Sequence, residues 1–227
     1  MATVRREPKQ QRSRDRVDQM LTAAGAIIGE SGIEGLSMIG VSERSGVPVG
    51  TAYRYFTDRD ELAAAFLDAE MEKIDQAVAA AFMELELVSV RSIVETSILA
   101  HFRHHKANPE MVMAWFGTPR PRVVHEHVQR MDERMGTWLR EAMSSAGLLS
   151  DDAPSFGEDM LVRLGDRMFE YVFSRPATDE VQLAIVENFS DMVATHLERF
   201  ATPAGVAGIP IAEFGAKLGE LPTHRRN

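Results

Sequence analysis

One stretch of the sequence, SMIGVSERSGVPVGTAYRYFTDRDEL from Ser37 to Leu62, constrains the fold more than any other. Apolar residues recur at helical spacing after Ser37, a residue type that commonly caps a helix N-terminus. Gly46 breaks this spacing, and Pro48 prevents the first helix from continuing. A second short helix is then expected to begin at Val49. The stretch therefore predicts two helices joined by a tight, glycine-containing turn.

The order of residues in this stretch is similar to the DNA-binding signature of the TetR family of bacterial transcriptional regulators. The similarity covers about the first third of the chain, and it rests on Gly46-Val47, Gly50-Thr51, Tyr53-Arg54-Tyr55-Phe56 and Leu62. The first helix of the motif departs from the family pattern at Gly40 and Ser42, and the second departs at Ala52. The resemblance implies a helix-turn-helix that places its second helix in the major groove of DNA.

The expected fold is all-α, with an N-terminal three-helix helix-turn-helix domain joined to a larger C-terminal helical domain. The resemblance implies that the larger domain binds a ligand and forms the dimer. We expect residues 12–62 to form the DNA-binding domain and residues 63–202 to form the helical ligand-binding and dimerisation domain. Residues 1–11 are expected to be a disordered basic arm, and residues 203–227 an irregular tail, because glycines and prolines follow one another closely there.

Helical periodicity predicts the elements on either side of the motif. A helix is expected from Arg12 to about Ser31, and a long one from Asp58 to about Leu85, which crosses the domain boundary. Further helices are expected at residues 90–106, 111–116 and 123–146, from Asp151 onward, and at 179–200. No strand-like alternation is evident. The tail is expected to form at most one or two weak helical turns, at residues 211–221.

The composition fits a helical protein that stays in the cytoplasm and does not contact a membrane. Hydrophobic residues make up 44% of the chain, which is enough to fill a core, and charges interrupt the longest apolar runs. The basic N-terminus lacks the apolar segment of a secretory signal. The chain has no cysteine, so disulfides, thiolate metal sites and cysteine nucleophiles are excluded together. We expect no cofactor.

The charge is distributed unevenly along the chain. The formal net charge is −9, but residues 1–20 carry +3, which leaves −12 on the remaining residues. A basic N-terminal segment on an acidic body is expected when one end of a protein meets phosphate. A solvated, disordered tail produces the same pattern, so the charge alone leaves both interpretations open.

Residue chemistry and the resemblance together indicate which residues contact DNA. Thr51 lies near the N-terminus of the second helix, where hydroxyl and N–H groups meet phosphates, and Gly50 allows close backbone approach. Val49 suits a thymine methyl, whereas Arg54 suits either a guanine or a phosphate. Arg59 stands where the family commonly has a phosphate-binding lysine. The full candidate set is Ser37, Val49, Gly50, Thr51, Tyr53, Arg54, Tyr55 and Arg59.

Methionine and aromatic residues crowd the middle of the larger domain and predict a pocket for an apolar or aromatic ligand, although such residues also fill cores. The candidate ligand-binding residues are His101, Phe102, His105, Met113, Phe116, Met135 and Trp138. His101 and His105 have the i, i+4 spacing of two zinc ligands, but no HExxH motif accompanies them. The side chains of His125-Glu126-His127 diverge on a helix. We therefore expect a polar contact to the ligand and no metal.

The pattern as a whole predicts a DNA-binding transcriptional regulator. The resemblance implies a homodimer that represses from a pseudo-palindromic operator and is released by a small molecule. A transcriptional activator that binds a small molecule is the first alternative. A helical enzyme is the second, but the sequence has no G-x-S-x-G elbow and no phosphate-cradling glycine motif after a strand.

Overall fold

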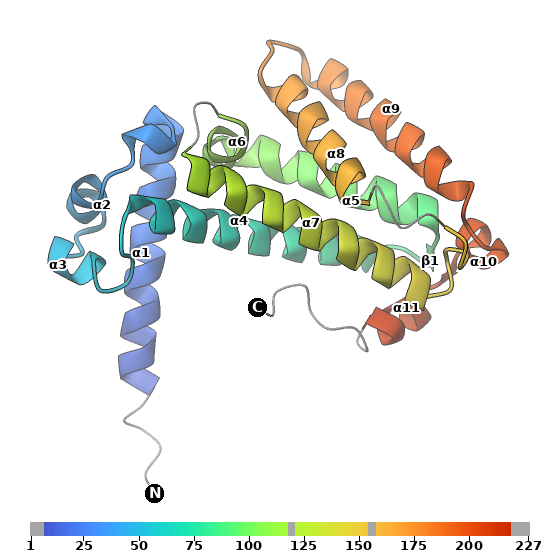
Figure 1. Ribbon diagram of the computed structural model, residues 1–227, viewed down its shortest axis with the longest axis horizontal. Coiled ribbons are helices and arrows are strands. Elements are labelled where there is room, and N and C mark those ends of the chain that lie inside the picture. The colour runs from blue at the N-terminus through green and yellow to red at the C-terminus, as the bar shows by residue number, and fades with distance from the viewer. Residues whose placement is uncertain (1–6, 118–120, 154–157, 219–227) are drawn as a thin grey trace, which may run out of the picture. The chain divides into compact units, whose positions relative to one another are not determined.

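The computed structural model of the protein describes residues 7–117, 121–153 and 158–218, and these are almost entirely helical (Figure 1). The expected all-α fold is therefore confirmed. The chain divides into two compact units, which consist of Met1–Glu72 with Asn108–His127 and of Lys73–Ala107 with Val128–Asn227.

The first unit contains the helix-turn-helix and the helices that support it. Its elements are α1 (Glu7–Ser31), the 3-10 turn η1 (Ile33–Gly35), α2 (Met38–Ser45), α3 (Val49–Ala52), the start of α4 (Arg59–Phe82), α6 (Pro109–Phe116) and the first turn of α7 (Arg122–Ser145). Figure 1 shows α2 and α3 on one side of α1. The long helix α4 continues into the second unit without a break, and so does α7.

Helix α1 begins earlier than its sequence pattern predicts. Residues 7–11, which were expected to be disordered, form its first turns. A proline is tolerated in the first turn of a helix because that N–H has no intrahelical partner, so Pro8 does not prevent this start. The side-chain amide of Gln11 also donates to Asp15 across one turn, at 2.8 Å. The rest of the predicted arm, residues 1–6, lies outside the described residues.

Small residues on α1 let two helices pack directly against it. A Cβ atom built on Gly25 would lie 2.7 Å from the Cε2 atom of Phe66 on α4, and Phe66 is itself buried. A Cβ atom built on Gly29 would lie 3.2 Å from the Cβ atom of Glu110 on α6. Around these contacts, the core of the unit is formed by Met20, Ala24, Ile28, Met38, Val41, Val47, Ala52, Phe56 and Leu62.

The second unit is built around α5 (Val90–Ala107). No residue of α5 before Arg103 is exposed, because neighbouring helices surround it. The other elements of this unit are the C-terminal part of α4, most of α7, α8 (Glu158–Phe173), α9 (Asp179–Glu198), α10 (Pro203–Ala207), α11 (Ile211–Leu218) and two short strands. Helix α8 begins at Glu158 and not at the predicted Asp151. Residues 151–153 form a turn, and residues 154–157 lie outside the described residues.

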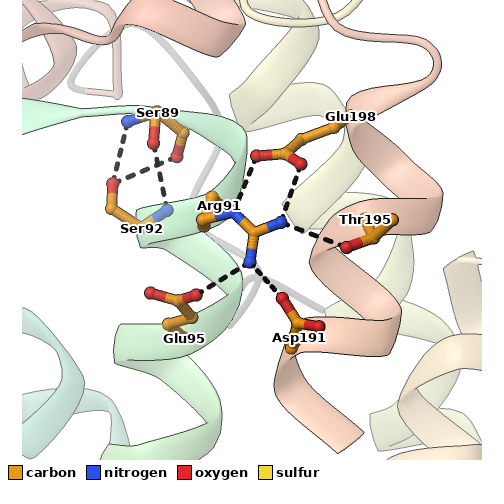
Figure 2. A network of polar contacts seen from close by, with 7 residues as sticks. All are labelled: Ser89, Arg91, Ser92, Glu95, Asp191, Thr195 and Glu198. Carbon is orange, nitrogen blue, oxygen red and sulfur yellow. Dashed lines mark hydrogen bonds and ion pairs between the residues drawn. The ribbon is translucent and has the colours of Figure 1, made fainter. Parts of the chain in front are cut away.

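One arginine joins α5 to α9 (Figure 2). The guanidinium group of Arg91 donates to both carboxylate oxygens of Glu198, at 2.8 Å each. Its remaining N–H groups reach Asp191 at 2.6 Å, Glu95 at 3.1 Å and the hydroxyl of Thr195 at 3.1 Å. These hydrogen bonds, with Glu198 first, raise the pKa of Arg91 above its already high usual value. A planar fork of donors fixes the orientation of its partners, so this network sets the register of α9 on α5.

The C-terminal segment that the structure describes, residues 203–218, forms two helices and a strand where an irregular tail was expected, and residues 219–227 of the predicted tail lie outside the described residues. Strand β2 (Ile209–Pro210) pairs with β1 (Leu87–Val88), although no strand was expected. Phe214 on α11 is buried, with its ring centroid 6.2 Å from that of Phe82 at the end of α4. At Gly205, a Cβ atom would lie 2.0 Å from the carbonyl oxygen of Leu148, so only glycine permits this close approach. The segment is therefore part of the core of the second unit.

Candidate functional site

The turn of the helix-turn-helix has the geometry that its sequence predicts. The hydroxyl of Ser37 accepts from the N–H of Gly40 at 3.1 Å, which caps the N-terminus of α2. Gly46 ends α2 in the left-handed region, with φ of +73°. Val47 is buried directly after it, and Pro48 precedes the first residue of α3. The backbone conformation of Gly46 thus directs the chain from α2 into α3.

Helix α3 presents most of the predicted DNA-contacting residues on its exposed side. Ala52 is buried, whereas Val49, Gly50, Tyr53 and Arg54 are exposed. Helical hydrogen bonding continues past Ala52, because the N–H of Tyr53 donates to the carbonyl of Val49 at 3.0 Å. The exposed side chains therefore lie on a single continuous surface. Thr51 is half-buried at its edge. Phe56, one helical turn after Ala52, is also buried.

Tyr55 differs from the other candidates because its hydroxyl contacts a residue of α1. It lies 3.0 Å from the hydroxyl of Ser13 on α1, at hydrogen-bonding distance. This hydrogen bond, together with Arg16, lowers the pKa of Tyr55 below its usual value. Tyr55 therefore anchors the end of the motif to α1. Ser13 was not predicted to take part, because a contact between residues so far apart in sequence leaves no local pattern.

The two candidate arginines have different surroundings. Arg59 donates to the backbone carbonyl of Glu34 at 3.2 Å and lies 3.5 Å from Asp60. Arg54 is exposed and makes no hydrogen bond or ion pair with any part of the chain that the structure describes. Arg54 can therefore reach a base without breaking a contact, whereas Arg59 must share or exchange its partners to hold a phosphate.

Ile39 is an exposed apolar residue of the motif that sequence reasoning did not single out. It lies on α2, two residues after the cap, and 64% of its surface is accessible. Its neighbours Met38 and Val41 are buried, so Ile39 points away from the core. The helical period of α2 predicts this exposure, because Ile39 does not fall on the face that carries Met38 and Val41.

Alanine substitutions at two glycines of the motif should separate an effect on folding from an effect on DNA contact. Gly46→Ala should lower the free energy of unfolding by about 1–2 kcal/mol, because an L-residue is strained at this positive φ. Gly50→Ala should fold normally, since its Cβ would meet nothing within 4 Å, but it should bind DNA more weakly if the backbone approaches phosphate there. Urea unfolding and fluorescence anisotropy with duplex DNA measure the two effects. Equal DNA affinity of Gly50→Ala and the native protein would contradict the close approach.

The predicted ligand-binding residues do not all belong to one unit. Met113 and Phe116 lie on α6 in the first unit, whereas His101, Phe102, His105, Met135 and Trp138 lie in the second. The predicted ligand-binding domain began at residue 63, yet α6 packs against α1 and belongs to the first unit. Whether these seven residues share a pocket stays a prediction.

Three of the candidates belong to an aromatic cluster between α5 and α8. The ring of Phe102 stacks on Phe173 with 5.9 Å between centroids, and both Phe102 and His105 are almost completely buried. The His105 ring lies edge-on to Phe169 at 5.1 Å and to His101 at 6.3 Å. Burial lowers the pKa of His105 to about 3, with smaller effects from the neighbouring histidines. Phe102 and His105 are therefore core residues of this unit.

The buried His105 predicts how stability depends on pH. Its pKa is depressed in the folded state, so the unfolded chain binds the extra proton, and stability is lost as the pH falls below about 6.5. Between pH 7 and pH 5 the free energy of unfolding should fall by about 2 kcal/mol from His105. Urea unfolding at both pH values measures this change. His105→Leu should lose this part of the dependence and keep the part that comes from His101, whose pKa burial also lowers, while His125→Gln, at an exposed position, should keep both.

Within the described residues, no group of three or more His, Cys, Asp or Glu side chains is arranged to hold a metal ion. In the same parts of the chain, no helix has the length and apolar character needed to cross a membrane.

Known proteins resemble the chain in both units. Residues 20–66 match the model of the bacterial regulatory proteins of the tetR family. The HTH-type transcriptional repressor KstR of Mycolicibacterium smegmatis is 27% identical over 191 residues, which cover 83% of this chain and 78% of KstR. KstR of Rhodococcus jostii (strain RHA1) is 25% identical over 189 residues, or 83% of this chain and 74% of that protein.

Solved structures share the fold. The fatty acid degradation regulator FadR from Bacillus halodurans superposes with a TM-score of 0.62 at 16% identity, covering 79% of this chain and 94% of FadR. A TetR-family transcriptional regulator from Rhodococcus sp. gives a TM-score of 0.65 at 16% identity, over 81% of this chain and 99% of the other. With the helix-turn-helix geometry above, the match of residues 20–66 and the KstR relatives support a DNA-binding transcriptional regulator of the TetR family, and the relatives are regulators and not enzymes.

Proposed function

We propose that the protein is a repressor that binds a pseudo-palindromic operator as a homodimer and is released by a small apolar or aromatic ligand. Repression is favoured over activation because the KstR relatives, which match most of the chain, are named repressors. DNA is contacted by the exposed side of α3, with Arg54 and Val49 at the base edges and Arg59 at a phosphate. The ligand binds among the helices of the second unit.

The observation that carries this proposal is the continuity of α4. The helix begins at Arg59 beside the motif, where the carboxylate of Asp58 accepts from the N–H groups of Asp60 and Glu61 at 2.9 Å each. It ends at Phe82, which packs against the core of the second unit. An unbroken helix transmits a displacement of one end to the other. A ligand that displaces its C-terminal half therefore changes the orientation of the DNA-binding residues, which is a coupling between two sites.

The homodimer is supported by apolar residues on α8 and α9 that the chain leaves uncovered. Met160, Leu164 and Tyr171 are exposed at helical spacing on α8, and Val181 and Met192 are exposed on one face of α9. On α9 this face is opposite the buried Val186 and Ser190. A second copy of these two helices would complete a four-helix bundle, and an obligate interface of this type buries about 2,000 Å² or more.

The two arginines provide the experiment that tests the proposed mode of DNA binding. Arg59→Ala should weaken binding to all duplexes alike and reduce the slope of log affinity against log salt by about one, because one phosphate contact is lost. Arg54→Ala should change the bases preferred in a selection from randomised duplexes. Anisotropy at several salt concentrations and sequencing of the selected pools measure these effects.

The two variants control for each other, because both remove one positive charge from the same unit. If Arg54→Ala leaves the selected sequence unchanged and lowers only the salt slope, Arg54 is a phosphate contact and does not read bases. If neither variant changes DNA affinity, the surface formed by α3 and the start of α4 is not the DNA-binding surface.

A further inference from the structure

His101 and His105 lie one turn apart on α5, but only His101 is placed to meet a ligand. His105 is 3% exposed and is enclosed by the rings of Phe169 and Phe173, at 5.1 and 6.0 Å. His101 keeps part of its surface accessible, although it lies on the helix that the other elements of this unit surround. Of these two histidines, His101 is therefore the one whose imidazole a ligand can reach.

A backbone carbonyl fixes which nitrogen of His101 carries the proton. The Nδ1 atom of His101 lies 2.8 Å from the carbonyl oxygen of Ser97, one turn earlier on α5. A carbonyl oxygen only accepts hydrogen bonds, so Nδ1 must be the donor. In a neutral imidazole the other nitrogen, Nε2, then has a lone pair and accepts. Within the described parts of the chain, Nε2 of His101 has no hydrogen-bond partner.

The surroundings keep His101 neutral near pH 7. Burial lowers its pKa, and this effect outweighs the opposing ones from the Ser97 carbonyl and from Asp75 on α4. The other titratable groups around it are His104, which also lowers the pKa, and His105, whose own pKa is well below 7. A neutral ring with Nδ1 protonated presents only a hydrogen-bond acceptor at Nε2.

We propose that Nε2 of His101 accepts a hydrogen bond from the effector, and that the effector is an uncharged molecule with a hydroxyl group on an apolar or aromatic skeleton. This inference rests on the proposed effector site in the second unit. A hydroxyl donates to Nε2, whereas an ether, a ketone or a carboxylate presents only acceptors and leaves two lone pairs facing each other. Leaving a polar group without a partner in a partly buried site costs affinity, so Nε2 selects for a donor.

Three naphthalenes of similar size test this selection: 2-naphthol, 2-methoxynaphthalene and 2-naphthoate. Titration calorimetry with the full-length native protein should give about threefold to tenfold tighter binding of 2-naphthol than of the methyl ether, as expected for one neutral hydrogen bond. The carboxylate should bind most weakly. In ¹⁵N NMR of the same protein, His101 should show a protonated Nδ1 at pH 7. Its Nε2 resonance should shift with 2-naphthol and not with the ether.

Two variants assign the effect to this side chain. In His101→Phe the preference for 2-naphthol over its ether should disappear, whereas His101→Gln, which keeps an acceptor, should retain part of it. His196→Gln, at an exposed position on α9, is the control and should behave as the native protein. The NMR measurement needs no substitution, so it decides the question even if His101→Phe does not fold.

The outcomes separate this inference from the function on which it rests. If all three probes bind equally and Nε2 does not shift, the effector site stands and the role of His101 is wrong. If Nδ1 is unprotonated at pH 7, the role of His101 is also wrong. If none of the three binds at millimolar concentration, the proposed effector site itself is contradicted, and this inference falls with it.

Discussion

Leu164→Arg should leave the purified protein monomeric at micromolar concentration and reduce its affinity for operator DNA by about 100-fold or more. Leu164 lies in the exposed apolar stripe of α8, where the proposed dimer buries it. A guanidinium group there would be desolvated in the proposed interface without a partner. A monomer engages only one half-site, so the gain in affinity from holding two half-sites at once is lost. Sedimentation velocity and DNA anisotropy measure the two effects.

Met83→Arg is the matched control for this experiment. Met83 directly follows α4 and is 73% exposed, more than any residue of the α8 and α9 stripe, so arginine there should change neither assembly nor DNA affinity beyond a small electrostatic effect. If Leu164→Arg stays dimeric while it remains folded by circular dichroism, α8 and α9 do not form the interface.

Saturating 2-naphthol should weaken operator binding by about 5- to 150-fold, the usual range for coupling between two sites. This expectation follows from the proposal that a ligand in the second unit acts on the helix-turn-helix through α4, which is continuous between the two units. Coupling of binding free energies is reciprocal, so saturating operator DNA should weaken 2-naphthol by the same factor. Calorimetric titration of the ligand with and without DNA, together with anisotropy of DNA with and without ligand, measures both sides.

Trp138→Ala should remove most of this response and leave operator affinity in the absence of ligand nearly unchanged. Trp138 is half-buried on α7, so its truncation leaves the core largely intact. Phe102→Ala is a poorer test, because Phe102 is buried and stacked on Phe173, and its loss should cost about 3–5 kcal/mol of stability. Coupling through α4 would be contradicted if DNA weakened the ligand by a different factor from that by which the ligand weakened DNA. It would also be contradicted if the ligand bound without changing the affinity for DNA.

Sequence periodicity predicts this fold well where helices bury one face. The buried positions of α2, Met38 and Val41, are those that the 3.6-residue spacing selects, and Gly46 ends that helix in the conformation that only glycine adopts easily. The sequence of a helix-turn-helix is informative because its turn requires particular residues at fixed positions.

The C-terminal segment was mispredicted because its order depends on distant contacts. Its glycines, Gly205 and Gly208, look like loop residues in sequence, yet Gly205 allows close approach to Leu148 and Gly208 adopts φ of +87° beside β1. The two-residue strands are too short to show alternation. Phe214 is buried because Phe82 lies beside it, and that is not visible from the local sequence.

The candidate site was predicted unevenly for the same reason. Exposure of Val49, Tyr53 and Arg54 follows from the helical period of α3. The hydrogen-bond partners of Tyr55 and Arg59 cannot be predicted from this period, because the packing of α1 and η1 brings Ser13 and the carbonyl of Glu34 near them. Likewise, the sequence spacing of His101 and His105 does not show which of them is buried. Only the rings packed around His105 distinguish it, as a core residue, from the accessible His101.

Selection of duplexes from a randomised pool by the full-length protein tests the central claim most directly. We expect enrichment of a pseudo-palindrome whose half-sites lie roughly 34–36 Å apart, or a multiple of this, since two recognition helices then enter successive major grooves on one side of the duplex. Leu164→Arg, which removes the dimer, should enrich no two-fold sequence. Enrichment of a single asymmetric site by the native protein, or no enrichment over the starting pool, would contradict the proposal that this chain is a repressor that binds its operator as a dimer.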